Sequence, residues 1–270
     1  MADCKRLSLN QITVERWSAL EAIEGCLRHQ IPSISFWRHK IADSGLSAVA
    51  KKVREAGLHV SSVCRGGLFV VSDSDERRKR IEDNLRAIDE AAELKADTLV
   101  IVAGASADVP IADGRRMIQD GLAAIVPHAA ERGVTLGLEP LHPMFAGDRC
   151  ALVTVREALS YASAFPAERV GVVLDAYHIW WDAELSANIA ASKGRIFGFH
   201  VCDWLSPLPD MLMGRGMMGD GVIDLPSMHR DVNAAGYTGP IEVEIFNQKI
   251  WEMDGDEILP WMKQRFESHV

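Results

Sequence analysis

The sequence predicts an α/β protein with one (β/α)8 TIM barrel that occupies residues 1–270 as a single domain. Three observations favour this fold. Eight short apolar segments alternate with longer amphipathic segments. The 270 residues suit a barrel, for which about 250 residues are typical. No linker or change of composition divides the chain. A doubly wound open sheet is the alternative, but no GxGxxG motif follows the first apolar segment.

The eight apolar segments are the expected strands. Several, such as TLVIV and VGVVL, are almost continuous aliphatic runs, which is typical of parallel strands covered on both faces. In chain order the expected strands are Leu7–Asn10, Ser33–Trp37, His59–Cys64, Thr98–Val102, Thr135–Glu139, Val170–Asp175, Ile196–His200 and Ile241–Ile245.

The segments between the strands carry helix signals. Lys51–Ala56 ends before Gly57, and another helix ends at Arg132 before Gly133, so both glycines suit a left-handed C-terminal cap. The segment Asp75–Leu94 is charged on one face and apolar on the other, which predicts a surface helix.

Later helices show signals of the same kind. Thr154 begins a capping box that predicts a helix over Glu157–Phe165. Pro226 suits the first turn of a helix that closes at Gly236. Pro127 lies inside a helical pattern, and we expect it to kink or split that helix.

Composition limits the function classes. The chain has 38 acidic and 29 basic side chains, a formal net charge of −9, which disfavours a nucleic-acid binder. No segment approaches the roughly 18 apolar residues of a membrane span, so no membrane partner is expected. The first residues lack the apolar core of a signal peptide, and the five scattered cysteines form no CxxC pair. These features predict a cytoplasmic protein with reduced thiols.

Possible metal ligands stand at the ends of the last four strands. They are Glu139, Asp175, His200 and Glu244. In a barrel the carboxyl ends of the strands meet at one mouth. Three clustered carboxylates stay ionised more easily around a cation, and with an imidazole they suit Mn²⁺, Mg²⁺, Co²⁺ or Zn²⁺. A single strand-end carboxylate is usually a helix cap or ion-pair partner, but four successive ligand types predict one divalent metal site.

The motifs around these residues are LEP, LDxxH, HVCD, the glycine-rich segment Gly216–Asp224 and GYTGPIEVEIF. With them the chain resembles the xylose isomerase-like barrels known as the sugar phosphate isomerase/epimerase family. The resemblance is sharpest between Glu139 and Phe246. It implies a metal held by the four residues named above and assigns a substrate contact to His178 and to Arg215. A structural histidine and a solvated loop arginine are the other interpretations of these two.

The resemblance implies a divalent-metal-dependent sugar isomerase or epimerase, with Glu139 and Glu244 exchanging a proton with substrate. The residues support this chemistry, because a cation polarises a carbonyl while a nearby carboxylate removes the adjacent proton. We expect a small sugar, ketose or inosose-like polyol as substrate. A metal-dependent lyase or hydratase acting on a keto-sugar or oxidised glycoside begins with the same proton abstraction and stays open. The resemblance also leads us to expect a homo-oligomer, either a dimer or a tetramer.

Other side chains near the strand ends are candidates for substrate contact. His142 follows Glu139, and the ring of Trp204 could stack on a sugar. A solvated loop histidine and a plug of the barrel are the competing interpretations. His39 and Arg65 follow the second and third strands, where they either contact substrate or form ordinary loop hydrogen bonds. Four more tryptophans follow strands and are expected mostly to plug the barrel: Trp37, Trp180, Trp181 and Trp251.

Two other functions are less consistent with the sequence. Barrel endonucleases need further ligands for a three-zinc cluster, including an Asp-Arg-His segment after the seventh strand and histidines at earlier strand ends. Here the segment reads Gly214-Arg215-Gly216, and the fourth strand runs into Ala103-Gly104 without a histidine. A non-catalytic sugar-binding protein would leave the clustered carboxylates without a purpose. No lysine-rich phosphate cradle is visible, which favours unphosphorylated substrates.

Overall fold

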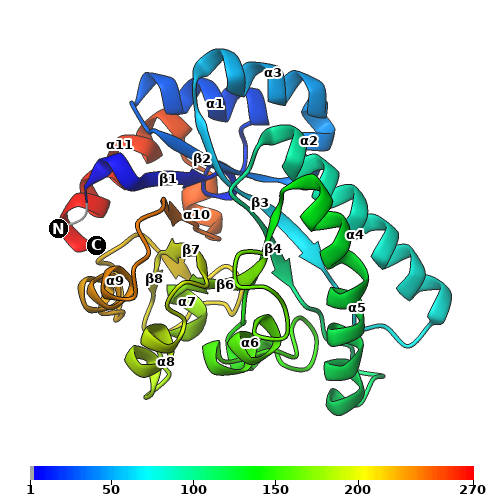
Figure 1. The fold of residues 1–270 in the computed structure, drawn as a ribbon. Coiled ribbons are helices and arrows are strands. Elements are labelled where there is room, and N and C mark those ends of the chain that lie inside the picture. Colours follow the sequence, from blue (N-terminus) through cyan, green and yellow to red (C-terminus); the bar gives the residue numbers. More distant parts are fainter. Residues whose placement is uncertain (1–2) are drawn as a thin grey trace.

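Eight parallel strands close into a barrel, in which the order around the ring is β1-β10-β7-β6-β5-β4-β3-β2. The computed structural model describes residues 3–270 (Figure 1). The predicted (β/α)8 barrel is therefore confirmed. Its strands are β1 (Leu7–Asn10), β2 (Ser33–Trp37), β3 (His59–Gly67), β4 (Thr98–Val102), β5 (Thr135–Leu138), β6 (Val170–Asp175), β7 (Ile196–Val201) and β10 (Ile241–Val243).

Helices surround the strands, and the long helices α4 and α5 pack side by side on the outside of the barrel (Figure 1). The helices are α1 (Ala19–Arg28), α2 (Arg38–Ser44), α3 (Leu46–Ala56), α4 (Ser74–Leu94), α5 (Ile111–Arg132), α6 (Val155–Ala162), α7 (Ala176–Ile179), α8 (Leu185–Ala191), α9 (Leu225–Ala234), α10 (Gln248–Trp251) and α11 (Gly255–His269). Three 3-10 turns, η1 (Cys4–Arg6), η2 (Gln11–Val14) and η3 (Pro143–Phe145), complete the regular structure of the described residues.

The apolar runs form strands because the barrel covers both of their faces. Every residue of β4 and of β6 is buried. Two strands end one residue before a predicted ligand, since β5 ends at Leu138 and β10 at Val243. The backbone ladder nevertheless continues, because the N–H of Glu139 donates to Ile101 O and the N–H of Glu244 donates to Val201 O. These bonds hold both glutamates rigidly at the mouth.

The predicted caps occur where expected, with small shifts of the helix bounds. Gly57 and Gly133 have φ values of 62° and 72°, so both adopt the left-handed conformation predicted for them. The Thr154 hydroxyl accepts the N–H of Glu157 at 3.1 Å. Helix α6 begins at Val155 and ends at Ala162, earlier than the predicted end at Phe165.

The sequence predicts a kink or a split of the helix at Pro127, and the split is wrong. Helix α5 continues through this residue to Arg132. The proline removes one backbone donor, but the helix buries Ile118, Leu122 and Ile125 against the protein. Apolar burial of this kind offsets the loss of one hydrogen bond, so tertiary packing decides the outcome.

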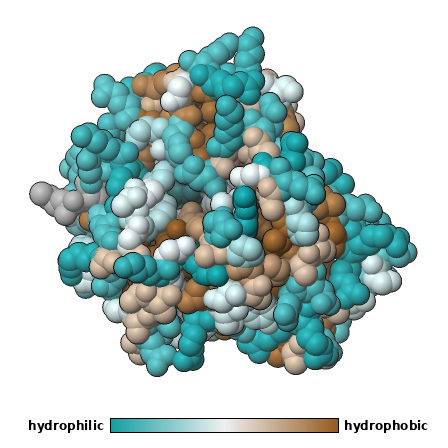
Figure 2. Space-filling model, viewed as in Figure 1, coloured by the Kyte–Doolittle hydropathy of each residue, from teal (hydrophilic) through white to brown (hydrophobic). Residues whose placement is uncertain are grey.

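The surface in the view of Figure 2 is mostly hydrophilic, with hydrophobic residues visible in patches between the charged ones. Among residues 3–270, no helix combines the length and the apolar character that crossing a membrane requires.

Candidate active site

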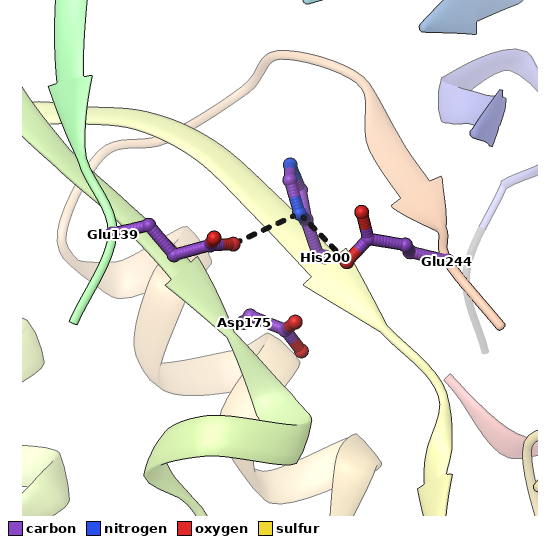
Figure 3. A group of neighbouring side chains, drawn as sticks. All are labelled: Glu139, Asp175, His200 and Glu244. Carbon is purple, nitrogen blue, oxygen red and sulfur yellow. Dashed lines mark ion pairs between the residues drawn. The ribbon is translucent and has the colours of Figure 1, made fainter. Parts of the chain in front are cut away.

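Four buried side chains meet at the mouth of the barrel (Figure 3). Each of Glu139, Asp175, His200 and Glu244 offers one ligand atom, and these atoms all lie within 4.8 Å of one another. The strand register explains the meeting, because Asp175 at the end of β6 is paired with His200 in β7. The two glutamates follow β5 and β10 directly. The structure thus brings together all four residues that the sequence analysis selected as ligands.

Ligand atoms of the cluster lack hydrogen-bond partners within the described residues, although they approach one another as ion pairs. His200 Nδ1 lies 3.4 Å from Glu139 Oε1 and 3.7 Å from Glu244 Oε2. Among the described residues, neither His200 Nδ1 nor Glu139 Oε1 has a hydrogen-bond partner, although both are buried. Buried polar atoms normally have partners. Unpaired carboxylate oxygen and imidazole nitrogen in one buried cluster are the chemistry that a divalent cation requires.

Arg215 reaches this cluster from the loop between β7 and β10. Its side chain is only 4% exposed, so it is not a solvated surface arginine. Its Nη1 donates to Asp175 Oδ2 at 2.8 Å and to Glu244 Oε2 at 2.9 Å. Its Nη2 lies 3.2 Å from Nε2 of His178, the residue in α7 that the sequence analysis selected for substrate contact. One guanidinium group offsets only part of the negative charge of the three carboxylates. A divalent cation could balance the remaining negative charge.

Burial and charge shift the titration of these groups. Burial, together with the charges of Glu244 and Asp175, raises the pKa of Glu139 to about 7 against the opposing effect of His200. Burial also acts to raise the pKa of Asp175, but Arg215 and His178 hold it below its ordinary value.

The histidines respond in opposite directions. Burial, together with the charge of Arg215, lowers the pKa of His178 to about 3 against the opposing effect of Asp175, so its imidazole is neutral at physiological pH. Burial acts against protonation of His200, but Glu242, Glu139 and Glu244 raise its pKa well above the ordinary value.

Two residues that the sequence analysis missed contact members of the cluster. Glu242 Oε2 lies 3.2 Å from His200 Nε2. Asn10, at the end of β1, donates through Nδ2 to Glu242 Oε2 and to Glu244 Oε1, each at 3.1 Å. Strand periodicity could have found Glu242, because residues two apart share one face of a strand and Glu242 precedes Glu244 by two positions. Asn10 also stands at a strand end.

The loop that carries Arg215 is held by Asp203, which the sequence analysis also missed. The carboxylate of Asp203 accepts backbone N–H groups from Gly219 at 2.9 Å and from Ile223 at 3.0 Å. The two-stranded ladder of β8 (Asp203–Trp204) and β9 (Arg215–Gly216) closes the same loop. A Cβ at Gly221 would collide with the backbone of Trp204 and with Asp203 Oδ1. The HVCD and glycine-rich motifs therefore fix the loop that holds Arg215 beside the cluster.

A cavity of about 330 Å³ opens beside the cluster. Glu139, Glu244, His178 and Arg215 line it, so four predicted site residues share one chamber. Its other walls include aromatic and aliphatic groups and two further arginines: Trp37, Leu141, Phe145, Phe246, Arg65 and Arg149. A volume of this size is at the lower end of the range for small-molecule sites.

His142 and Trp204, both predicted to contact substrate, are not among the residues that line this cavity. Their rings pack on each other with centroids 5.0 Å apart, and Trp204 also packs on Trp180 at 5.3 Å. The backbone N–H of His142 donates a hydrogen bond to His178 Nδ1 at 3.2 Å. The structure thus places His142 behind His178.

Of the other candidates near the strand ends, some line the cavity and others do not. The ring of His39 packs on Trp37 with centroids 6.0 Å apart, and His39 does not line the cavity. Trp37 and Arg65 do line it. Trp251 packs on Phe246 at 5.7 Å, whereas Trp181 is 37% exposed.

Comparison with solved structures shows close likeness over the whole chain. Protein SMc04130 from Sinorhizobium meliloti 1021 is 44% identical, with a TM-score of 0.96 and 99% of each chain covered. The structure described as the IOLI protein with a binding zinc atom is 19% identical, with a TM-score of 0.84 and 98% of each chain covered. At that identity the likeness shows the fold alone.

The curated relatives with a named activity are enzymes. An inosose isomerase of Bacillus velezensis is 22% identical over 98% of this chain and 97% of its own length. A 3-dehydroshikimate dehydratase of Pseudomonas putida is 28% identical over 63% of this chain. The aligned part makes up only 27% of that dehydratase, so the match concerns one portion of a longer protein.

A family model covers nearly the entire barrel, from the start of α1 into α11. The match extends over residues 19–265. It agrees with the closed ring of eight parallel strands and with the resemblance carried by the motifs from Glu139 to Phe246. The chain belongs to the family of xylose isomerase-like TIM barrels.

Proposed function

We propose that the protein is a divalent-metal-dependent isomerase or epimerase that acts on a small ketose or inosose-like polyol by proton transfer next to a carbonyl. The observation that carries this proposal is the meeting of Glu139, Asp175, His200 and Glu244 beside a cavity of about 330 Å³. The similarity to an inosose isomerase over 98% of the chain supports it.

The four residues would hold one Mn²⁺, Mg²⁺, Co²⁺ or Zn²⁺ ion. Their unpaired oxygen and nitrogen atoms fit such an ion. When bound, it would polarise the carbonyl of the substrate and make the neighbouring C–H bond more acidic.

Glu139 and Glu244 are suited to move the proton. They follow β5 and β10, which are separated in the ring by β6 and β7. Both line the cavity, so each can approach a substrate held there from its own direction. One carboxylate removes the proton and the other returns one, which is general acid–base catalysis by two groups.

His178 and Arg215 are suited to orient the substrate. His178 is neutral and its Nδ1 accepts the backbone N–H of His142, so its Nε2–H can donate a hydrogen bond to a hydroxyl group. Arg215 carries a fixed positive charge that its two carboxylate partners hold at the cavity wall. Trp37, Phe145 and Phe246 supply apolar walls, and such walls exclude water and strengthen these polar contacts.

A dehydratase is the second candidate, because a 3-dehydroshikimate dehydratase matches 63% of this chain at 28% identity. The same carboxylate would remove the proton next to a carbonyl. The outcome would differ afterwards, since a β-hydroxyl group would leave as water and no proton would be returned to carbon.

One experiment distinguishes these reactions. Mn²⁺-loaded protein is incubated in D₂O with ketoses, inososes, 3-keto sugars and 3-dehydroshikimate, and products are followed by NMR. An isomerase or epimerase forms a new isomer with deuterium on the carbon next to the carbonyl. A dehydratase forms an unsaturated product with loss of water. Metal-loaded protein that exchanges no hydrogen and forms no product with any of these compounds contradicts both proposals.

A further inference from the structure

Two arginines outside the proton-transfer machinery face the same cavity. Arg65 belongs to β3, and Arg149 lies in the loop between η3 and α6. Both line the chamber together with Glu139 and His178, and both side chains are partly buried. Two segments far apart in the sequence thus bring two arginines to one cavity.

Neither arginine is neutralised by the protein. Within residues 3–270, the side chains of Arg65 and Arg149 make no ion pair and no hydrogen bond, and the Arg149 guanidinium lies 5.4 Å from the centre of the Phe145 ring. Arg38, also partly buried, shows the contrast, because it forms ion pairs with Asp83 at 2.7 Å and with Glu90 at 2.6 Å. Charged groups that are removed from water normally have such partners.

The environment of Arg65 disfavours its charge. Burial lowers the pKa of Arg65, and Arg149 lowers it further, whereas the effect of Glu139 is in the opposite direction. Arg149 thus opposes the charge of Arg65, and both residues line the same cavity. A structure that leaves two like charges together beside an open cavity has space and charge for an anion.

The nearby carboxylates do not neutralise the two arginines. Asp148 lines the cavity but is exposed to solvent. Asp210 uses its carboxylate to accept the N–H groups of Leu212 at 2.8 Å and Met213 at 2.7 Å. Glu139 belongs to the cluster of candidate metal ligands, so a bound cation would occupy its charge.

We propose that Arg65 and Arg149 form an anion subsite, and that the substrate carries a carboxylate or phosphate group in addition to its carbonyl. The planar guanidinium fork matches the oxygen atoms of either group. The inference rests on the proposed function for the reacting end of the substrate and narrows its class to acidic keto-polyols. It keeps open the phosphorylated substrates that the absence of a lysine cluster disfavoured.

The test measures ligand binding to Mn²⁺-loaded protein by isothermal titration calorimetry, with ligands that lack a ketone or aldehyde group and cannot react. Shikimate is compared with methyl shikimate, and glucitol 6-phosphate is compared with glucitol. We expect one anion to bind at least about 10-fold more tightly than its neutral counterpart. Preference for shikimate identifies a carboxylate site, and preference for glucitol 6-phosphate identifies a phosphate site.

Variants show whether the arginines cause the preference. Arg65→Met and Arg149→Met remove the charge and keep most of the side-chain length. Each should weaken binding of the preferred anion about 10-fold and leave the neutral counterpart unaffected. Arg156→Met is the matched control, because Arg156 is 73% exposed and pairs with Glu184 on the surface. Metal content and the thermal midpoint of every variant verify its folding.

Three results overturn the subsite. They are equal affinity for anion and neutral ligand, no binding of either anion at millimolar concentration by fully metal-loaded protein, and binding by both methionine variants within about twofold of wild type. Failure of the proposed function is distinguishable, because it appears as absent metal or absent deuterium exchange. Arginine-dependent anion binding that persists in such a protein supports the subsite and contradicts the proposed function alone.

Discussion

Arg215 Nη1 donates a hydrogen bond of 2.8 Å to Asp175 Oδ2. The guanidinium group of Arg215 thus contacts the carboxylate at the end of β6, at the barrel mouth. The same nitrogen lies 2.9 Å from Glu244 Oε2. Arg215 therefore connects two members of the candidate metal cluster and also lines the cavity. It is placed both to balance the charge of the cluster and to contact a substrate.

Replacing Arg215 tests this position. Arg215→Met should lower kcat/KM by an amount equivalent to about 2–4 kcal/mol, because the lost hydrogen bonds are largely desolvated. We expect metal content to stay at the wild-type level. Steady-state kinetics on the substrate found in the NMR screen and elemental analysis of the purified variant provide the measurements. Arg230→Met, on the exposed side of α9, is the control. Wild-type kinetics in Arg215→Met would contradict a role in catalysis or binding.

Removal of His200 tests the metal site. Wild-type protein should contain about one divalent ion per chain, and His200→Ala should lose most of it, since each ligand contributes strongly to affinity. His128→Ala in α5 is a suitable control, because its ring pairs with Asp89 at 3.0 Å, away from the cluster. Metal is measured by mass spectrometry after gel filtration, and circular dichroism monitors the fold. An unchanged metal content in His200→Ala would show that the ligand assignment is wrong.

The two glutamates can be separated from metal binding by amide substitution. Glu139→Gln and Glu244→Gln each keep an oxygen that can still coordinate but lose the ability to act as a base. We expect both variants to retain much of the metal and to lose about 10²–10⁴ in turnover. Wild-type protein in D₂O should place deuterium on the reacting carbon, and both variants should fail to do so. An isomerised product without deuterium from wild-type protein would instead indicate a hydride shift and exclude the two-glutamate relay.

A pH-dependent contribution to stability is expected at the ion-pair network on α2 and α4. Arg38 lowers the pKa of Asp83. A carboxylate with a lowered pKa in the folded state stabilises the fold above its unfolded pKa of about 3.9, and this contribution disappears as the pH falls through the folded pKa.

Arg38→Met should therefore reduce the free energy of unfolding by about 1 kcal/mol at neutral pH, a value kept small for solvent screening because Asp83 is 41% exposed. Urea unfolding of wild type and variant is measured at neutral pH and below the folded pKa. The difference should shrink at low pH. A difference that is independent of pH would mean that lost packing, and not the ion pairs, causes the destabilisation.

Gly221 is required by the close approach of Asp203. Gly221→Ala should lower the thermal midpoint and reduce activity, because the added Cβ collides with Trp204 and Asp203 and displaces the loop that carries Arg215. We expect metal content to be retained, since none of the four candidate ligands lies in this loop. Gly147→Ala is the control, because a Cβ there meets no atom within 4 Å and needs no positive φ. Equal thermal midpoints for both variants would contradict this explanation of the glycine-rich motif.

Local patterns of the sequence determined the barrel and the candidate ligands. Aliphatic runs such as Thr98–Val102 form strands because both of their faces are covered, and all five residues of this strand are buried. Left-handed caps at Gly57 and Gly133 depend on the backbone freedom of glycine, which is a property of the residue itself. Parallel strands in a barrel share one mouth, so Glu139 and His200 could be predicted as neighbours without coordinates.

The tertiary structure alone decided which distant residues share the cavity. Asn10 and Glu242 meet because the closure of the ring pairs β1 with β10. Pro127 stays inside one helix because the apolar face of α5 is buried. Arg65 and Arg149 line one cavity because the loop after η3 brings Arg149 to the cavity that Arg65 lines from β3. Such contacts depend on loop paths and on packing between segments far apart in the chain, and no local periodicity encodes them.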